Sequence, residues 1–67
     1  MQSHAHVQHL ADASCLASAR RWRTHAEVLR DNAEAAYLTA GQRATLLREA
    51  EAAERQADWW LDAIEAH

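Results

Sequence analysis

Hydrophobic and polar residues alternate along two stretches of the chain with the spacing of an α-helix. In the first stretch, apolar residues recur every seven positions in two interleaved series: Cys15, Trp22, Leu29 and Ala36, and Ala19, Ala26, Ala33 and Ala40. In the second stretch, the same spacing joins Leu46, Ala50, Ala53, Ala57, Trp60 and Ile64. Residues three and four apart lie on one face of a helix. The pattern therefore predicts two amphipathic helices, each with a narrow apolar stripe, which we call the seam.

The start of the second helix is marked by the stretch YLTAGQR, residues 37–43. Thr39 and Gln42 have the spacing of a capping box, in which each side chain accepts a hydrogen bond from the backbone amide of the other residue. A new helix is therefore expected from Ala40. The predicted organisation is one helical-hairpin domain over residues 1–67, with a helix at about residues 6–37, a turn at 38–40 and a helix at about 40–65.

Folding the chain back at this turn predicts an antiparallel pair, in which residue i lies near residue 79 − i, roughly, if the turn is tight. Trp22 then faces Ala57, and Trp60 faces Ala19, so that bulky side chains nest against alanines. The alternative is one uninterrupted helix in a long coiled coil. That arrangement would place Arg43 and Glu54 in the seam and leave the capping box without a purpose, so the hairpin is favoured.

A single hairpin buries only one stripe of each helix, which is little apolar surface for a chain of 67 residues. Several large apolar residues lie outside the seam: Leu10, Leu16, Val28, Leu47 and Leu61. We therefore expect an all-α, alanine-rich, coiled-coil-like hairpin that pairs into a homodimeric four-helix bundle or docks on a larger protein. In architecture this hairpin resembles Rop, a family of small RNA-binding hairpin dimers. The resemblance implies nucleic-acid binding as an alternative function.

Composition narrows the classes of function. Alanine fills 17 of the 67 positions and proline none, which favours helix. A net charge of −3 gives no general attraction to nucleic acid or to anionic membranes. The lone Cys15 excludes an internal disulfide framework and suits a reducing compartment. Because no stretch has the pattern of a signal peptide or a membrane span, a cytoplasmic protein is expected.

Two clusters of chemically active side chains are weak candidates for a site. His4, His6 and His9 lie near the N-terminus, where a fraying helix end does not supply the fixed geometry of a metal site, although adventitious metal binding stays open. Carboxylates gather outside the seam of the second helix, with no histidine among them: Glu51, Glu54, Asp58, Asp62 and Glu65. Inward-facing carboxylate–histidine sets are typical of di-iron bundles, and this arrangement differs from them. We expect no catalytic residue, no metal and no cofactor.

Contact with another chain is the stronger hypothesis. Because Trp60 belongs to the seam, its neighbour Trp59 must lie on the flank of the helix, where an exposed tryptophan is typical of a binding hot spot. A second, basic patch surrounds Trp22 and would serve the nucleic-acid alternative. The predicted partner-binding residues are Trp59, Arg55, Leu61, Arg20, Arg21 and Arg23. The expected function is that of a small non-enzymatic protein–protein interaction module, an adaptor, regulator or inhibitor such as phages and plasmids encode among their accessory proteins.

Overall fold

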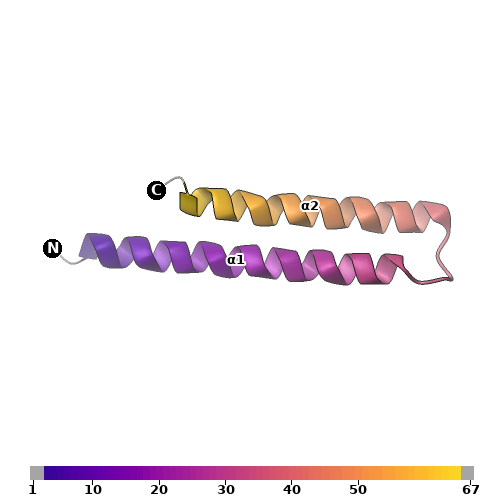
Figure 1. Ribbon diagram of the computed structural model, residues 1–67, viewed down its shortest axis with the longest axis horizontal. Coiled ribbons are helices and arrows are strands. Elements are labelled where there is room, and N and C mark those ends of the chain that lie inside the picture. Colours follow the sequence, from indigo (N-terminus) through magenta and orange to yellow (C-terminus); the bar gives the residue numbers. More distant parts are fainter. Residues whose placement is uncertain (1–2, 66–67) are drawn as a thin grey trace.

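Two antiparallel helices make up the fold. The structure is a computed structural model that describes the backbone of residues 3–65 and the side chains of residues 11–64. Helix α1 spans Ser3–Ala33 and helix α2 spans Ala40–Glu65, and the two lie side by side (Figure 1). Their Cα atoms extend over 58 × 15 × 10 Å, so the molecule is a rod two helices wide. The predicted antiparallel hairpin is confirmed, and the single continuous helix is excluded.

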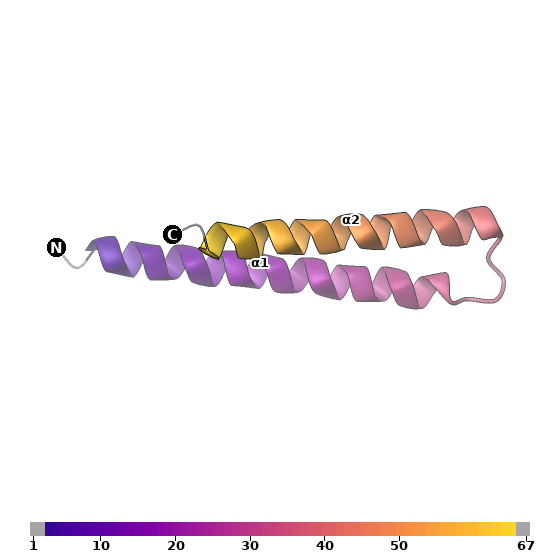
Figure 2. The same cartoon turned by 45° about the horizontal axis from the view of Figure 1, so that its top comes forward.

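The two helices differ in length, and α1 projects beyond the end of α2. Figure 1 and Figure 2 both show the N-terminal turns of α1 extending past the C-terminal end of α2. The side chains of the predicted histidine cluster and of Leu10 belong to this projection and lie outside the described residues. Within the described part of the chain, neither helix combines the length and the apolar character that crossing a membrane requires.

The core between the helices consists almost entirely of alanine. Among the described side chains, seven apolar ones are at most 8% exposed, and six of them are alanines: Ala19, Ala26, Leu29, Ala33, Ala50, Ala53 and Ala57. All seven belong to the predicted seam, so the buried face of each helix was predicted correctly. Small side chains allow two helices to approach closely and still pack at the density of a protein interior. They also bury little apolar area, because each alanine contributes only one methyl group.

The position of Trp22 corrects the predicted packing. This seam residue was expected to face an alanine inside the core, yet it is 38% exposed. Trp60 is half-buried, and so is Cys15. The physical reason is that the alanines before and after these positions hold the two helices close together. An indole ring has no room between the helix axes at that separation. The bulky rings therefore lie at the edge of the interface.

The connector between the helices is longer than predicted. Helix α1 ends at Ala33 instead of continuing to residue 37, and residues 34–39 cross to α2. The amides of Glu34 and Ala35 donate to the carbonyls of Asp31 and Asn32, at 3.1 and 3.2 Å, which tightens the final turn. The tight turn at 38–40 was wrong because the helix axes lie about 8–10 Å apart. Two of those three residues are already used in starting α2, so further residues are needed to cross this gap.

Side chains close both helix ends at the connector. The amide of Gln42 donates to Thr39 Oγ1 at 3.1 Å, and the amide of Thr39 donates to Gln42 Oε1 at 2.9 Å, which confirms the capping box. Arg43 reaches back across the connector and donates from Nε to the carbonyl of Ala33 at 2.8 Å and from Nη2 to that of Ala35 at 3.1 Å. Carbonyls at the end of a helix lack partners within it, so Arg43 supplies a donor to Ala33. At Ala35 it adds a second donor, because that carbonyl also accepts from the amide of Leu38 at 3.3 Å.

Two ion pairs join the helices and show their register. Arg30 makes a bidentate contact with Glu54, at 2.9 Å from Nε to Oε2 and 2.7 Å from Nη2 to Oε1. Arg23 lies 3.9 Å from Asp58. The paired residue numbers total 84 and 81, a few residues above the total of 79 expected for a tight turn, and long side chains can span this difference along the axis. The pairs therefore agree with the predicted antiparallel order of the two helices.

Candidate interaction surface

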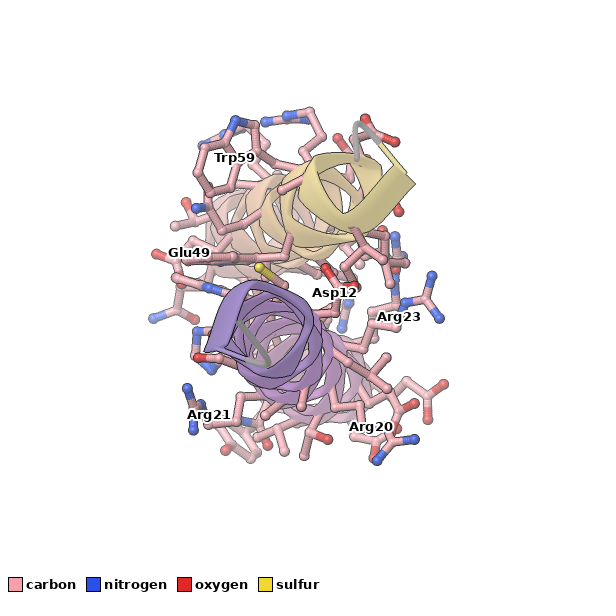
Figure 3. The ribbon with its side chains drawn as sticks, turned by 90° about the vertical axis from the view of Figure 1, so that its left-hand side faces the viewer. Asp12, Arg20, Arg21, Arg23, Glu49 and Trp59 are labelled. Carbon is pink, nitrogen blue, oxygen red and sulfur yellow. The ribbon has the colours of Figure 1, made fainter. Side chains whose placement is uncertain are left out.

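The hairpin has two broad sides of different chemistry. Viewed along the rod, Figure 3 shows Trp59 and Glu49 on one side and Arg23 on the opposite side. We call the first the tryptophan side and the second the ion-pair side. The ion-pair side carries both cross-helix pairs, Arg23 with Asp58 and Arg30 with Glu54. These four charged groups therefore already have partners within the chain.

Trp22 and His25 also belong to the tryptophan side. Each step along a helix turns the side chain by about 100°, and Trp22 lies between Arg21 and Arg23, which Figure 3 shows on opposite sides of α1. Trp22 consequently lies above the seam and leans toward the tryptophan side. Its ring meets the imidazole of His25 edge to face, with centroids 6.0 Å apart and an interplanar angle of 70°. The two aromatic rings cover the flank of α1 there.

Trp59 and Trp60 have different environments, as the seam predicted. Trp59 is 57% exposed, whereas Trp60 is half-buried at the edge of the core. The rings meet edge to face, with centroids 4.8 Å apart and planes at 82°, so the outer indole rests on the inner one. The Nε1 atom of Trp60 is buried and has no hydrogen-bond partner among the described residues. Trp59 is thus fixed in place by packing and still presents most of one face to the outside.

The predicted contacts on α2 divide between two sides of the helix. Arg55 is exposed and lies four residues before Trp59, so the two share the outer face of α2. Leu61 is half-buried and lies two residues after Trp59, so it points about 160° away, toward the ion-pair side. The structure brings Trp59 and Arg55 together and separates Leu61 from them.

The three predicted arginines of α1 also divide. Figure 3 shows Arg20 and Arg21 on the face of α1 away from α2, pointing to opposite sides, and Arg23 beside α2. Arg21 donates to Ser18 Oγ at 3.3 Å, and Arg23 lies near the carboxylate of Asp58. The guanidinium groups therefore do not converge on one surface where a phosphate backbone could follow them.

Two carboxylates of α2, Glu54 and Asp58, lie on the ion-pair side, whereas Glu49 lies on the tryptophan side (Figure 3). The pKa of Glu54 lies below its ordinary value because the Arg30 side chain donates hydrogen bonds to it, and the pKa of Arg30 is raised for the same reason. Among the described residues, no three histidine, cysteine, aspartate or glutamate side chains gather as they would around a metal ion. Both groups of the strongest pair are thus held in their charged forms, which is suited to joining helices and not to proton transfer.

Two features of the surface were missed from the sequence. The first is the exposure of Trp22, which the seam placed in the core, whereas the 50% exposure of Val28 agrees with its predicted position outside the seam. The second is that Arg23 and Arg30 pair across the interface. The spacing of charges along one helix cannot reveal a cross-helix pair, because that pair depends on the register set by the connector.

Comparison of the chain with protein-family models, with characterised proteins and with solved structures found no match, so the surface described above is the basis on which the function is argued.

Proposed function

We propose that this chain is a small non-enzymatic interaction module that binds another protein through its tryptophan side. The main observation in support is that small side chains form the core while large aromatic side chains are exposed, which is the reverse of the usual arrangement. The core is built from six alanines and one leucine, while Trp22 and Trp59 remain 38% and 57% exposed. Tryptophans bury more apolar surface than any of the core residues, so the largest available gain in burial lies outside the hairpin.

The composition of the tryptophan side supports this proposal. Exposed apolar side chains that stand singly are ordinary on protein surfaces, but rigid aromatic rings grouped on one side are typical of binding hot spots. The edge-to-face packing on Trp60 holds Trp59 in one orientation, with ring centroids 4.8 Å apart. A contact residue that is ordered before binding loses less conformational entropy when the partner arrives.

The mode of action would be steric. A rod 58 Å long can cover a helix groove or an active-site entrance on a larger protein, or hold two proteins together. Adaptor, regulator and inhibitor are three forms of this one mode. A cytoplasmic location is part of the same proposal, because the half-buried Cys15 is free within a chain that contains no second cysteine.

Affinity capture with quantitative mass spectrometry tests the proposal, using wild type, Trp59→Ala and Tyr37→Ala as tagged baits. Tyr37 is 87% exposed in the connector, so it is a matched control that removes an aromatic ring outside both helices. We expect wild type and Tyr37→Ala to recover the same partner, and Trp59→Ala to recover about tenfold less or lower still. Circular dichroism should show equal helicity for the three.

Equal recovery by all three baits would refute the proposal. Recovery that depends on Arg20 and Arg21, falls steeply with added salt and survives Trp59→Ala would instead favour the nucleic-acid alternative.

A further inference from the structure

We propose that the occupant of the tryptophan side is a second copy of this chain, so that two hairpins pack through it into a four-helix assembly. This inference rests on the proposed function, since it names the partner of the same surface. Three observations carry it: the dimensions of the side, the small core of the single hairpin, and the placement of two opposite charges.

The dimensions match what a stable dimer needs. The broad sides of the rod measure 58 × 15 Å between Cα atoms. Contact over the part of this side where α1 and α2 lie next to each other has the order of size of a standard stable interface, which buries about 800 Å² on each partner. The total accessible surface of the hairpin is 5165 Å², so such a contact would cover a minor but substantial part of it.

The small core favours a permanent partner. Helix pairs of this length ordinarily become stable by burying a second apolar face against further helices. Among the side chains that the structure describes, Leu29 is the one buried residue larger than alanine, and it is still 8% exposed. A second copy of the chain presents the same tryptophan side. A two-fold symmetric contact between the copies therefore buries that side on both of them.

Charge on the tryptophan side is self-complementary. Figure 3 shows Glu49 of α2 on that side and Arg21 of α1 at its edge, on the half of α1 away from α2. Neither forms an ion pair within the described part of the chain, unlike Arg23 and Arg30 on the opposite side. Glu49 lies toward the connector and Arg21 toward the open end of the rod. A two-fold axis perpendicular to this side, midway between them, brings Arg21 of each copy opposite Glu49 of the other.

The same axis gives Trp59 a partner surface. Rotation about a point midway between Arg21 and Glu49 places Trp59 of one copy near the level of Val28 on the second copy. Val28 is 50% exposed, and its exposure has no explanation within the single hairpin. Each tryptophan would therefore pack against an aliphatic side chain beside a charge pair.

A charge-swap experiment tests the arrangement. The dimer dissociation constant is measured by light scattering during dilution for wild type, Arg21→Glu, Glu49→Arg, the double variant, and Arg20→Glu as a control. We expect each single variant to weaken the dimer about threefold to tenfold, because like charges then face each other twice. The double variant should recover the wild-type value. Arg20→Glu should leave it unchanged, since Figure 3 shows Arg20 pointing to the other side.

A monomer at about 100 µM wild-type protein would overturn the inference. A dimer whose double variant is as weak as the single variants would overturn it as well, because Arg21 and Glu49 would then not face each other. Failure of the inference differs from failure of the proposed function. If the protein is monomeric while Trp59→Ala still abolishes capture of a different protein, the proposed function stands and only self-association is removed.

Discussion

Arg43 lies in the first turn of α2, beside the connector, and its guanidinium group binds backbone carbonyls at the end of α1. Its side chain donates to the carbonyls of Ala33 and Ala35, and its own position in the first turn of α2 is fixed by the capping box of Thr39 and Gln42. One side chain thus joins the end of α1 to the start of α2. The sequence alone shows Arg43 as a charge in the wrong phase for a coiled coil, which excludes one fold without revealing this role.

Replacement of Arg43 by methionine keeps much of the apolar stem and removes both hydrogen bonds. We expect the free energy of unfolding to fall by about 1–3 kcal/mol, because two carbonyls lose a charged donor in a partly buried setting. Urea denaturation followed by circular dichroism measures this. Arg48→Met is the matched control, since the recorded hydrogen bond of Arg48 stays within α2, at 3.2 Å to Thr45 Oγ1. The control should change stability by less than about 0.5 kcal/mol. Equal losses would show that Arg43 is no special link.

The neighbouring tryptophans predict opposite effects on stability and binding. In dilute solution, Trp60→Ala should lower the free energy of unfolding by about 2–3 kcal/mol, less than for a fully buried indole because Trp60 is only half-buried. Trp59→Ala should change it by less than about 0.5 kcal/mol, because its ring is 57% exposed. Thermal unfolding of the two variants compares them directly. A larger loss for Trp59→Ala would mean that the outer ring stabilises the hairpin and is no spare contact.

At the scale of the elements, the local sequence predicted the start of α2 more accurately than the end of α1. The capping box predicted Ala40 as the first residue of α2, and the structure agrees. Residues 34–37 have good helix formers and an apolar phase that continues the seam, so the sequence predicted helix there. The distance between the helix axes and the reach of Arg43 override this local preference. Both depend on contacts between residues that are remote in the sequence.

Gly41 offers a test of the first turn of α2. Its backbone does not have a positive φ, and an added Cβ would meet only Thr39 Oγ1, at 4.0 Å. Alanine restricts the unfolded chain more than glycine does, so Gly41→Ala should raise the free energy of unfolding by about 0.5 kcal/mol. Thermal unfolding at neutral pH measures the change. A lower melting temperature would indicate that the capping box needs the conformational freedom of glycine.

The cross-helix pair of Arg30 and Glu54 predicts a dependence on pH. The pKa of Glu54 in the folded chain lies below its ordinary value of 4.5, because Arg30 donates to the carboxylate. The stabilisation is therefore fully present above the ordinary pKa, and it is lost as the pH falls through the lower folded-state pKa. Glu54→Gln should lower the melting temperature at pH 7 and have no such effect near pH 2. Asp62→Asn, which removes an exposed carboxylate from the same helix, is the control. A gap between wild type and Glu54→Gln that persists at acid pH would contradict the assignment.

At the scale of the whole molecule, the spacing of the apolar residues in the seam was enough to predict the hairpin. It was not enough to predict which large side chains remain exposed. Seven-residue spacing identified every residue that is buried in the described part of the chain, because helical geometry alone decides which positions share a face. The predicted partner-binding residues do not share one surface, because the same geometry separates Leu61 from Trp59, and Arg20 from Arg21. Trp22 was assigned to the core because its phase is right, and only the closeness of the alanine packing excludes it. Side-chain volume, which a binary pattern ignores, decides what remains outside.

Sedimentation equilibrium on wild type, Trp59→Ala and Leu16→Ala tests most directly whether the tryptophan side is the surface that associates. Leu16 is 37% exposed and points toward the ion-pair side, so the two variants remove one apolar side chain from each broad side. The account predicts that wild type and Leu16→Ala sediment with twice the 7.5 kDa mass of the chain at about 100 µM, and that Trp59→Ala sediments with the mass of one chain. Equal masses for the three proteins, or dissociation by Leu16→Ala and not by Trp59→Ala, would contradict it.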